Sequence, residues 1–584
     1  MSTEYISPGA FVVLRLPSES HIVTKIQPNA TISLGKYGSF QANHLVGRPY
    51  HLTFEILDRP KTESASNTGL RVVPPAELYA SIKDDEPVTP SDVGSNGLGA
   101  GDGGVEYDIV GEDGEVVMRT NRQIIDDPNS QVMTMEEIED MKKQNTGSGK
   151  DLVAKILESH SALDQKTAFA LAKYTLRKTK KYLKRFTVLP LDVSALTRWM
   201  MNEKEPMKIM ELREEMLALI GSWSNVHYTA LTPMPPLGEK DRTIEGAGRW
   251  LVIDETAGLV VAYLAEKLGI LHPEPSRSKE PAPNATSHDD TQEADIELDT
   301  VDNHTLDPEQ PEAKPHQPQP HKTPVPLTTN TIIVLHSNAQ PNLSLLNYFH
   351  FDPFSPTPSH PLSTHLKMIS WLQLLAPEDD AGYTEPESVS QEVLQTWKSG
   401  KRGNYFRKRR RWERIKSVVD ETRAGGFDGL IVASVMNPIG ILRHTIPLLR
   451  GAAQVVIYSP TVESLVEVAD YYSSARRTAF INNPPDPETM PMEDFPVNPT
   501  LLLAPTIHTA RARNWQVLPG RTHPLMTGRG GAEGYVLTAT RVLPAEGKVE
   551  ARGKFKRRKV DKEATATGSL SKVDTPMTEE GVVE

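Results

Sequence analysis

The sequence predicts a mixed α/β protein with two folded parts, a small β-barrel-like N-terminal domain and a doubly wound α/β domain. Short strand-like runs separated by turn residues fill residues 8–75, which is typical of a small antiparallel sheet or barrel. Strand-like and helix-like segments then alternate from about residue 250 to 541, which indicates a parallel sheet flanked by helices. Long disordered insertions are predicted at 76–118 and 273–328, because these segments are acidic or proline-rich and lack hydrophobic periodicity.

The composition narrows the possible function classes. Only 38% of the 584 residues are hydrophobic and 47 are prolines, as expected for a globular protein that carries non-globular insertions. The chain contains no cysteine, which excludes disulfides, thiolate nucleophiles and zinc fingers. Apolar runs stay well short of the roughly 20 residues that span a bilayer, and the first ten residues lack a signal-peptide pattern. The net charge of −12 is unevenly distributed, so individual basic segments can still face a polyanion.

The N-terminal domain is predicted over residues 1–75. It contains five runs of alternating hydrophobicity, at 11–16, 21–26, 31–34, 51–57 and 70–73. Proline, asparagine and glycine residues lie between several of these runs and favour tight turns. The pattern therefore predicts short strands in one small sheet, followed by the acidic insertion.

A helical basic connector is predicted over residues 119–190. Thr134 and Glu137 have the spacing of a capping box, in which each side chain accepts a hydrogen bond from the other residue's backbone amide. A second helix is expected at 151–160. A third helix, at 162–186, carries an apolar stripe that ends with Phe186 and lies beside a basic face.

The basic face of this third helix is the first candidate binding site. Its cations are Lys173, Arg177, Lys180, Lys181, Lys184 and Arg185, and no acid occurs between residues 173 and 185. One interpretation is an ordinary solvated helix face. Solvated faces normally mix charges of both signs, however, so an acid-free basic face in an acidic protein favours a polyanionic partner.

The α/β domain is predicted over residues 191–545 and is organised around the segment 250–269. A short apolar run ends at Asp254, a turn contains Gly258, and an amphipathic helix follows until Gly269. A nucleotide-binding loop usually contains several glycines, because its backbone must approach the ligand closely. Here Gly258 is the only glycine of the loop, so the sequence predicts a cofactor fold whose cofactor loop is filled by side chains.

The rest of the α/β domain alternates regularly. Strands are predicted at 331–335, 429–433, 454–458, 500–503 and 535–541, and helices at 343–349, 359–375, 401–416, 438–449 and 462–472. This alternation predicts one parallel sheet.

No catalytic constellation occurs at the predicted carboxyl ends of the strands, where ligands of such sheets bind. The segments that follow these strands are 254–258, 335–338, 433–438 and 458–460. None contains a carboxylate pair spaced for acid–base chemistry, a base–nucleophile pair or clustered metal ligands. Asp254 and Glu255 are adjacent, which favours a capping turn over a catalytic pair.

Several motifs resemble one known family. They are FVVLR at 11–15, GKYG at 35–38, GRPY at 47–50, NRQIIDD at 121–127, KKYLKRF at 180–186 and LPGRTHPLM at 518–526. The order of strands, with the spacing of Asn437-Pro438 and Tyr458-Ser459-Pro460, looks like a degenerate class I S-adenosylmethionine methyltransferase (Rossmann-like) domain. The motifs resemble the non-catalytic subunits of eukaryotic tRNA (adenine-58-N1) methyltransferase. The resemblance covers about residues 1–75, 119–270, 329–385 and 425–545.

The resemblance implies a subunit without a cofactor that pairs with a catalytic methyltransferase subunit as a dimer of heterodimers, binds tRNA and acts in the nucleus. S-adenosylmethionine is expected on the catalytic partner only. The partner's glycine-rich loop and Asp-x-Pro motif correspond to residues 256–258 and 434–438 here, and the latter segment has no acid. The alternative is an active S-adenosylmethionine-dependent RNA methyltransferase with a divergent cofactor loop.

Two basic clusters lie outside the resemblance. The first comprises Arg407, Lys408, Arg409, Arg410 and Arg411, flanked by aromatic residues. This composition is typical of a nucleic-acid surface, and equally of a nuclear-import signal. The second, KFKRRK at 554–559, lies in a tail at 546–584 that is predicted to be disordered, and it favours the import interpretation.

Overall fold

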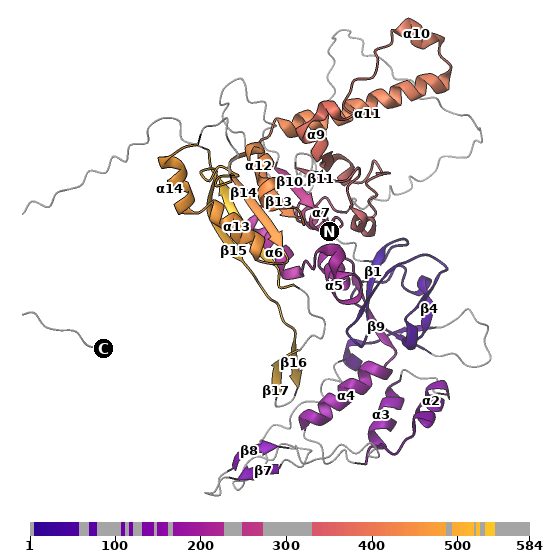
Figure 1. Ribbon diagram of the computed structural model, residues 1–584. Coiled ribbons are helices and arrows are strands. Elements are labelled where there is room, and N and C mark those ends of the chain that lie inside the picture. Colours follow the sequence, from indigo (N-terminus) through magenta and orange to yellow (C-terminus); the bar gives the residue numbers. More distant parts are fainter. Residues whose placement is uncertain are drawn as a thin grey trace, which may run out of the picture. The chain divides into compact units, whose positions relative to one another are not determined.

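The structure is a computed structural model in which 12 segments are described. They are residues 5–57, 69–78, 107–110, 116–120, 131–144, 149–161, 168–226, 248–272, 330–485, 493–518, 521–525 and 532–543 (Figure 1). All of them belong to the compact unit Met1–Leu543. The predictions for 273–328 and for the tail at 546–584 fall outside these segments and stay predictions.

The N-terminal sheet is antiparallel and has five strands in the order β2-β1-β9-β5-β6. Its strands are β1 (Phe11–Arg15), β2 (His21–Lys25), β5 (Thr53–Ile56), β6 (Leu70–Val72) and β9 (Arg185–Pro190). A two-stranded ladder of β3 (Thr31–Ser33) and β4 (Ser39–Gln41) accompanies it. The predicted N-terminal antiparallel sheet is therefore confirmed, and its central strand β9 comes from a distant part of the chain.

Strand β9 corrects the predicted third helix. The helix α4 (Ala168–Tyr182) ends four residues before Phe186, and the chain then enters the sheet. Phe186 stacks on Phe40 and Phe54 at ring-centroid distances of 4.8 and 5.7 Å, and it is only 1% exposed. Because Phe186 and Val188 alternate with partly buried residues, this run has the two-residue period of a strand. The predicted connector 119–190 thus ends in a strand of the N-terminal sheet.

The connector otherwise has the predicted helices. These are α2 (Met135–Gln144) and α3 (Lys150–Glu158). The capping box is confirmed, since the Thr134 amide donates to Glu137 at 2.9 Å and the Glu137 amide donates to the Thr134 hydroxyl at 3.2 Å. The insertion 76–118 was predicted to be disordered, but it contains β7 (Tyr107–Val110), which forms a hairpin with β8 (Val116–Thr120).

The predicted doubly wound α/β domain is confirmed as a seven-stranded sheet in the order β12-β11-β10-β13-β14-β18-β15. The strands are β10 (Arg249–Asp254), β11 (Thr331–His336), β12 (Leu366–Ser370), β13 (Phe427–Ala433), β14 (Leu449–Ser459), β15 (Leu502–His508) and β18 (Tyr535–Arg541). Numbered within the sheet, the first five follow the doubly wound order 3-2-1-4-5. The sheet is not entirely parallel, because β18 runs antiparallel to both β14 and β15.

The predicted helix at 359–375 is also corrected. It consists of α8 (Leu362–His365), the edge strand β12 and α9 (Trp371–Leu375). Strand β12 pairs with β11 in parallel along its whole length, and those ladder hydrogen bonds outweigh the helical propensity of a short mixed segment.

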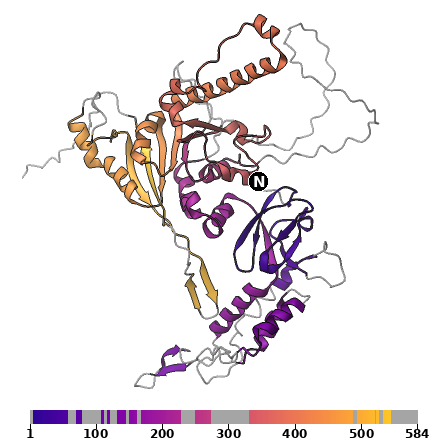
Figure 2. The same ribbon diagram turned by 45° about the vertical axis from the view of Figure 1, so that its right-hand side comes forward.

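Helices cover both faces of the large sheet (Figures 1 and 2). Alternate strand residues point to opposite faces, so Trp250 and Val252 join one core while Leu251 and Ile253 join the other. The first core includes residues of α5 (Val193–Glu203), α6 (Glu214–Trp223) and α7 (Leu259–Lys267). The second includes residues of α12 (Pro438–Thr445) and α13 (Glu463–Tyr471), and the C-terminal end of α11 (Ser399–Arg423).

The remaining elements are short. They are α10 (Gln391–Thr396), α14 (Ser474–Asn482), the hairpin of β16 (Trp515–Leu518) and β17 (Arg521–Pro524), and 3-10 helices at Gly35–Tyr37, Ala42–His44, Pro206–Ile209, Ser344–Phe349, Pro377–Asp379 and Ile446–Leu448. Among the described helices, none combines the length and apolar composition needed to cross a bilayer.

Candidate functional site

The first candidate site is the crevice at the carboxyl ends of β10, β11 and β13. After β10 the chain adds β11 and β12 on one side of this strand and then β13 and β14 on its other side, so the strand order reverses at β10. A doubly wound sheet binds its ligands beside such a point. A cavity of about 180 Å³ lies here and is lined by Asp254, Glu255, His336, Asn338 and Met436, among others. The site is therefore placed where a cofactor would be expected, and its side chains decide whether one fits.

Asp254 is committed to the turn that follows β10. Its buried carboxylate accepts hydrogen bonds from the amide and hydroxyl of Thr256 at 2.7 and 2.6 Å, and from the amide of Val261 at 2.9 Å. Burial raises the pKa of Asp254, and these hydrogen bonds oppose that shift. The carboxylate thus satisfies free amides at the beginning of α7, which confirms the predicted capping turn for this residue.

Glu255 bridges the ends of two neighbouring strands. One carboxylate oxygen accepts hydrogen bonds from the Ser434 hydroxyl at 2.8 Å and from the Val435 amide at 2.7 Å. Because Ser434 follows β13 and Glu255 follows β10, this bridge crosses the point where a cofactor would have to enter. The acid that stands in place of a loop glycine therefore joins the two strand ends across the crevice and lines its cavity.

The backbone of the loop after β10 is also covered by the segment that contains Leu343 and Leu345. A Cβ atom on Gly258, which has φ +89°, would lie 3.0 Å from the Cα atom of Leu343. The Ala257 carbonyl accepts a hydrogen bond from the Leu345 amide at 3.0 Å. Since Leu343 is 1% exposed and packs directly on the loop, the protein's own chain occupies the approach that a nucleotide needs.

The described residues at this crevice also lack a catalytic constellation. The Nδ1–H of His336 donates to the Asn338 carbonyl at 2.7 Å, and burial lowers the pKa of the imidazole. No group of three or more metal-ligating side chains occurs in the described part of the chain. The crevice offers neither a base–nucleophile pair nor a metal centre.

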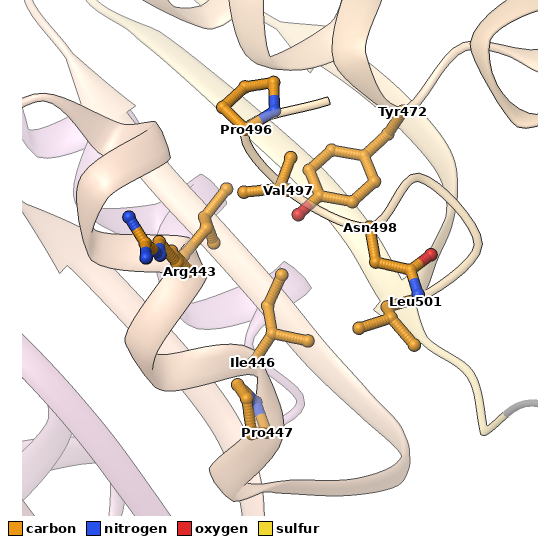
Figure 3. A pocket seen from close by; sticks show the side chains of 9 residues that line it. Arg443, Ile446, Pro447, Tyr472, Pro496, Val497, Asn498 and Leu501 are labelled. Carbon is orange, nitrogen blue, oxygen red and sulfur yellow. The ribbon is translucent and has the colours of Figure 1, made fainter. Parts of the chain in front are cut away.

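A second cavity, of about 200 Å³, lies between α12, α13 and the segment before β15 (Figure 3). Ile446, Val497 and Leu501 make its walls apolar. The Tyr472 hydroxyl points into it, and no hydrogen-bond partner for this buried oxygen occurs among the described residues. Burial raises the pKa of Tyr472, so the phenol stays neutral. No acid–base pair occurs among the described residues that line this cavity.

The second candidate site is the basic face of α4. Lys173, Arg177 and Lys181 are exposed and lie one turn apart, so they form a continuous stripe, whereas Lys180 is half-buried and bonds Glu19 at 2.8 Å. Lys184 lies beyond the end of the helix. The sequence did not single out Lys178, whose pKa is lowered by burial and by the nearby charges of Lys181 and Arg177.

Arg185 is a correction to the predicted binding face. Its side chain is 6% exposed and pairs with Glu55, at 2.9 Å, and with Glu77. Glu55 lies on the neighbouring strand β5, so the pair cross-links two strands of the N-terminal sheet. A buried guanidinium with two carboxylate partners is a structural residue and presents no cation to a ligand.

Comparison with known proteins identifies the family. A model of the Gcd10p family matches residues 5–398, which is more than half of the chain. The chain belongs to the Gcd10p family. A protein from Aspergillus fumigatus named tRNA (adenine(58)-N(1))-methyltransferase non-catalytic subunit is 48% identical, over 98% of this chain and 99% of that relative. A protein of the same name from Schizosaccharomyces pombe is 26% identical, over 96% of this chain and 97% of the relative. The predicted resemblance is therefore confirmed.

Two solved structures that match this Gcd10p-family chain do so with low TM-scores and little shared sequence. A tRNA (m1A58) methyltransferase from Aquifex aeolicus is 9% identical with a TM-score of 0.34, covering 92% of this chain and 100% of that chain. A SAM-dependent O-methyltransferase from Thermotoga maritima is 8% identical with a TM-score of 0.35, covering 93% and 97%.

The Gcd10p match ends one residue before α11, which carries the third candidate site. Arg407, Lys408, Arg410 and Arg411 are exposed there, as a binding surface requires. Arg409 is partly buried, because it lies 3.3 Å from the Tyr405 hydroxyl and 3.4 Å from Glu413. The sequence presented these five cations as one block, and the helix separates them onto different faces.

Proposed function

We infer that this chain is the non-catalytic, tRNA-binding subunit of a tRNA (adenine-58-N1) methyltransferase. The single observation that carries the inference is the closed crevice, in which Asp254 caps the turn and Glu255 joins β10 to β13. The family match and the printed names of the relatives agree with it. S-adenosylmethionine and the chemical step would then belong to a catalytic partner subunit.

The assembly and its location extend this proposal. Two copies of this chain and two of the catalytic subunit would form a dimer of heterodimers, and the complex would act in the nucleus. Both statements rest on the resemblance alone. Mass measurement of the purified complex tests the stoichiometry, since a simple heterodimer would give half the expected mass.

The α4 stripe supports the tRNA-binding part of the proposal. Lys173, Arg177 and Lys181 point to solvent from a helix that lacks acids, within a protein of net charge −12. Cations one helical turn apart can each meet a different phosphate, and phosphate contacts position a nucleic acid without reading its bases. We therefore propose that α4 binds the tRNA backbone without sequence preference.

Two rival functions are separable by experiment. An active methyltransferase with a divergent loop would methylate tRNA without a partner. A scaffold would support the partner without touching RNA. The test is to express this chain alone, the catalytic subunit alone and both together, and to measure tRNA binding and adenosine methylation. Our proposal expects methylation only from the pair, with tRNA affinity that depends on this chain. Methylation by this chain alone, or unchanged tRNA affinity in its absence, would overturn it.

A further inference from the structure

The long helix α11 carries a basic surface that differs from the α4 stripe in both composition and construction. Between residues 399 and 416 there are nine basic residues and one acid. The helix is 25 residues long, and only Val419 and Thr422, near its C-terminal end, are buried. The N-terminal half is thus held by other means and leaves most of its circumference to solvent.

Aromatic contacts hold one side of this half against the preceding segment. The Trp412 indole donates to the Tyr383 carbonyl at 2.9 Å, and the Val389 amide donates to the Tyr405 hydroxyl at 3.3 Å. The rings of Trp397 and Tyr405 meet edge to face at 5.8 Å. Tyr405, Arg409 and Trp412 are spaced four and three residues apart, so they share one face of the helix. This inner face fixes the rotation of α11 about its axis.

The opposite face consists of arginines. Arg407, Arg410, Arg411 and Arg414 recur at intervals of three, one and three residues, which places all four within about 100° of the helix circumference. All four are exposed. Within the described part of the chain, the one ion pair formed by residues 399–416 is that of Arg409 with Glu413, which excludes the four arginines. Like charges at these spacings destabilise a helix by about 0.2–0.5 kcal/mol per pair, and a bound anion would relieve this repulsion.

We propose that this four-arginine face of α11 is a second tRNA contact, in which each guanidinium binds one phosphate group of the RNA backbone through two hydrogen bonds. The proposal rests on the tRNA-binding function inferred above. A guanidinium presents a planar fork of donors and binds phosphate with two hydrogen bonds, whereas a lysine acts as a point charge. The α4 stripe contains two lysines and one arginine, so it supplies general attraction, and the α11 face supplies geometrically defined contacts.

The helix also distinguishes this role from nuclear import. An import signal is a contiguous run of five to eight basic residues. In α11 the run is divided, because Arg409 turns inward to Tyr405 while Arg407, Arg410 and Arg411 turn outward. Arg414, which lies outside the run, completes the outward face. Spatial grouping by helical period fits a rigid polyanion better than a receptor that reads consecutive residues.

The test uses the complex of this chain with its catalytic subunit and measures tRNA affinity over a range of salt concentrations. Changing Arg407, Arg410, Arg411 and Arg414 to Gln should reduce the salt slope by about 3.6, at about 0.9 per lost phosphate contact. The matched control changes Lys401, Arg402, Lys416 and Arg423, which are also exposed, to Gln. It removes the same charge from the other sides of the same helix and should keep the wild-type slope.

A third variant separates charge from geometry. Changing the four arginines to Lys keeps the charge, so the slope should stay while affinity falls, because the paired hydrogen bonds are lost. Equal losses in the face variant and the control would overturn the proposal. Wild-type tRNA binding by the face variant would also overturn it. If that variant binds tRNA normally but fails to accumulate in the nucleus, the cluster is an import signal. If the wild-type complex itself does not bind tRNA, the proposed function fails instead.

Discussion

Neutralising the exposed stripe of α4 should weaken tRNA binding in a salt-dependent way. The variant carries Lys173→Gln, Arg177→Gln and Lys181→Gln. If each side chain neutralises one phosphate, three contacts disappear and the salt slope falls by about 2.7. Between 50 and 200 mM salt, the wild-type complex should then lose about 40-fold more affinity than the variant does. Folding should survive, because all three side chains are exposed.

The assay is a tRNA titration of the assembled complex at several salt concentrations, with tRNAs of different sequence. Because the contacts are made to phosphates, the loss should be the same for every tRNA. The control changes Lys204, Lys208 and Lys267 to Gln, which removes equal charge from exposed positions directly after α5, on the 3-10 helix that follows and on α7. Parallel salt plots of equal affinity for wild type and the α4 variant would refute the reasoning and leave α4 as a solvated face.

Three further predictions concern stability and the insertions. Arg185→Ala should destabilise the chain by about 1–3 kcal/mol in denaturant unfolding, because Glu55, 1% exposed, loses one of its two cationic partners and keeps only Arg71. Arg177→Ala on the exposed stripe should cost under about 0.5 kcal/mol, and equal costs would contradict the assignment. Hydrogen bonds from Arg71 and Lys150 lower the pKa of Glu77 to about 2, below its usual 4.5. The stability that Glu77→Gln removes should therefore be fully present above about pH 5 and fade as the pH falls toward 2, and a pH-independent difference would contradict the linkage. Deleting residues 275–326 should leave thermal stability and co-purification with the catalytic subunit intact, because this segment has too little apolar surface to offset ordering entropy. Loss of the complex would make it a docking element.

The strands of the large sheet were predictable because each is a short apolar run bounded by turn residues. The predicted strand at 535–541 coincides with β18. The antiparallel direction of β18 was not predictable from these residues. Strand direction depends on the route that the connecting segment takes between two strands, and not on the strand's own residues. The same limit applies to β9, which pairs with β1 and β5 from far along the sequence.

The candidate sites show a second limit of prediction from sequence: the sequence shows which residues are charged but not which of them are buried. Arg185 lies four residues after Lys181 and belongs to the same basic run of the sequence. In the structure, however, Arg185 is buried and pairs with the carboxylates of Glu55 and Glu77. Conversely, Arg414 completes the outward face of α11 and could have been found from the helical period that links it to Arg411 and Arg407. The filled cofactor loop was predictable because a missing glycine is visible directly. The bridge from Glu255 to Ser434 was not, since it joins residues 179 positions apart.

The central claim is that the crevice of this chain is closed to S-adenosylmethionine. The most direct measurement is calorimetric titration of the cofactor into the isolated chain, into the isolated catalytic subunit and into their complex, with folding of each sample checked by circular dichroism. The closed crevice predicts no binding heat for the isolated chain and one cofactor per heterodimer for the complex. Micromolar binding to the folded isolated chain, or two cofactors per heterodimer, would contradict the account.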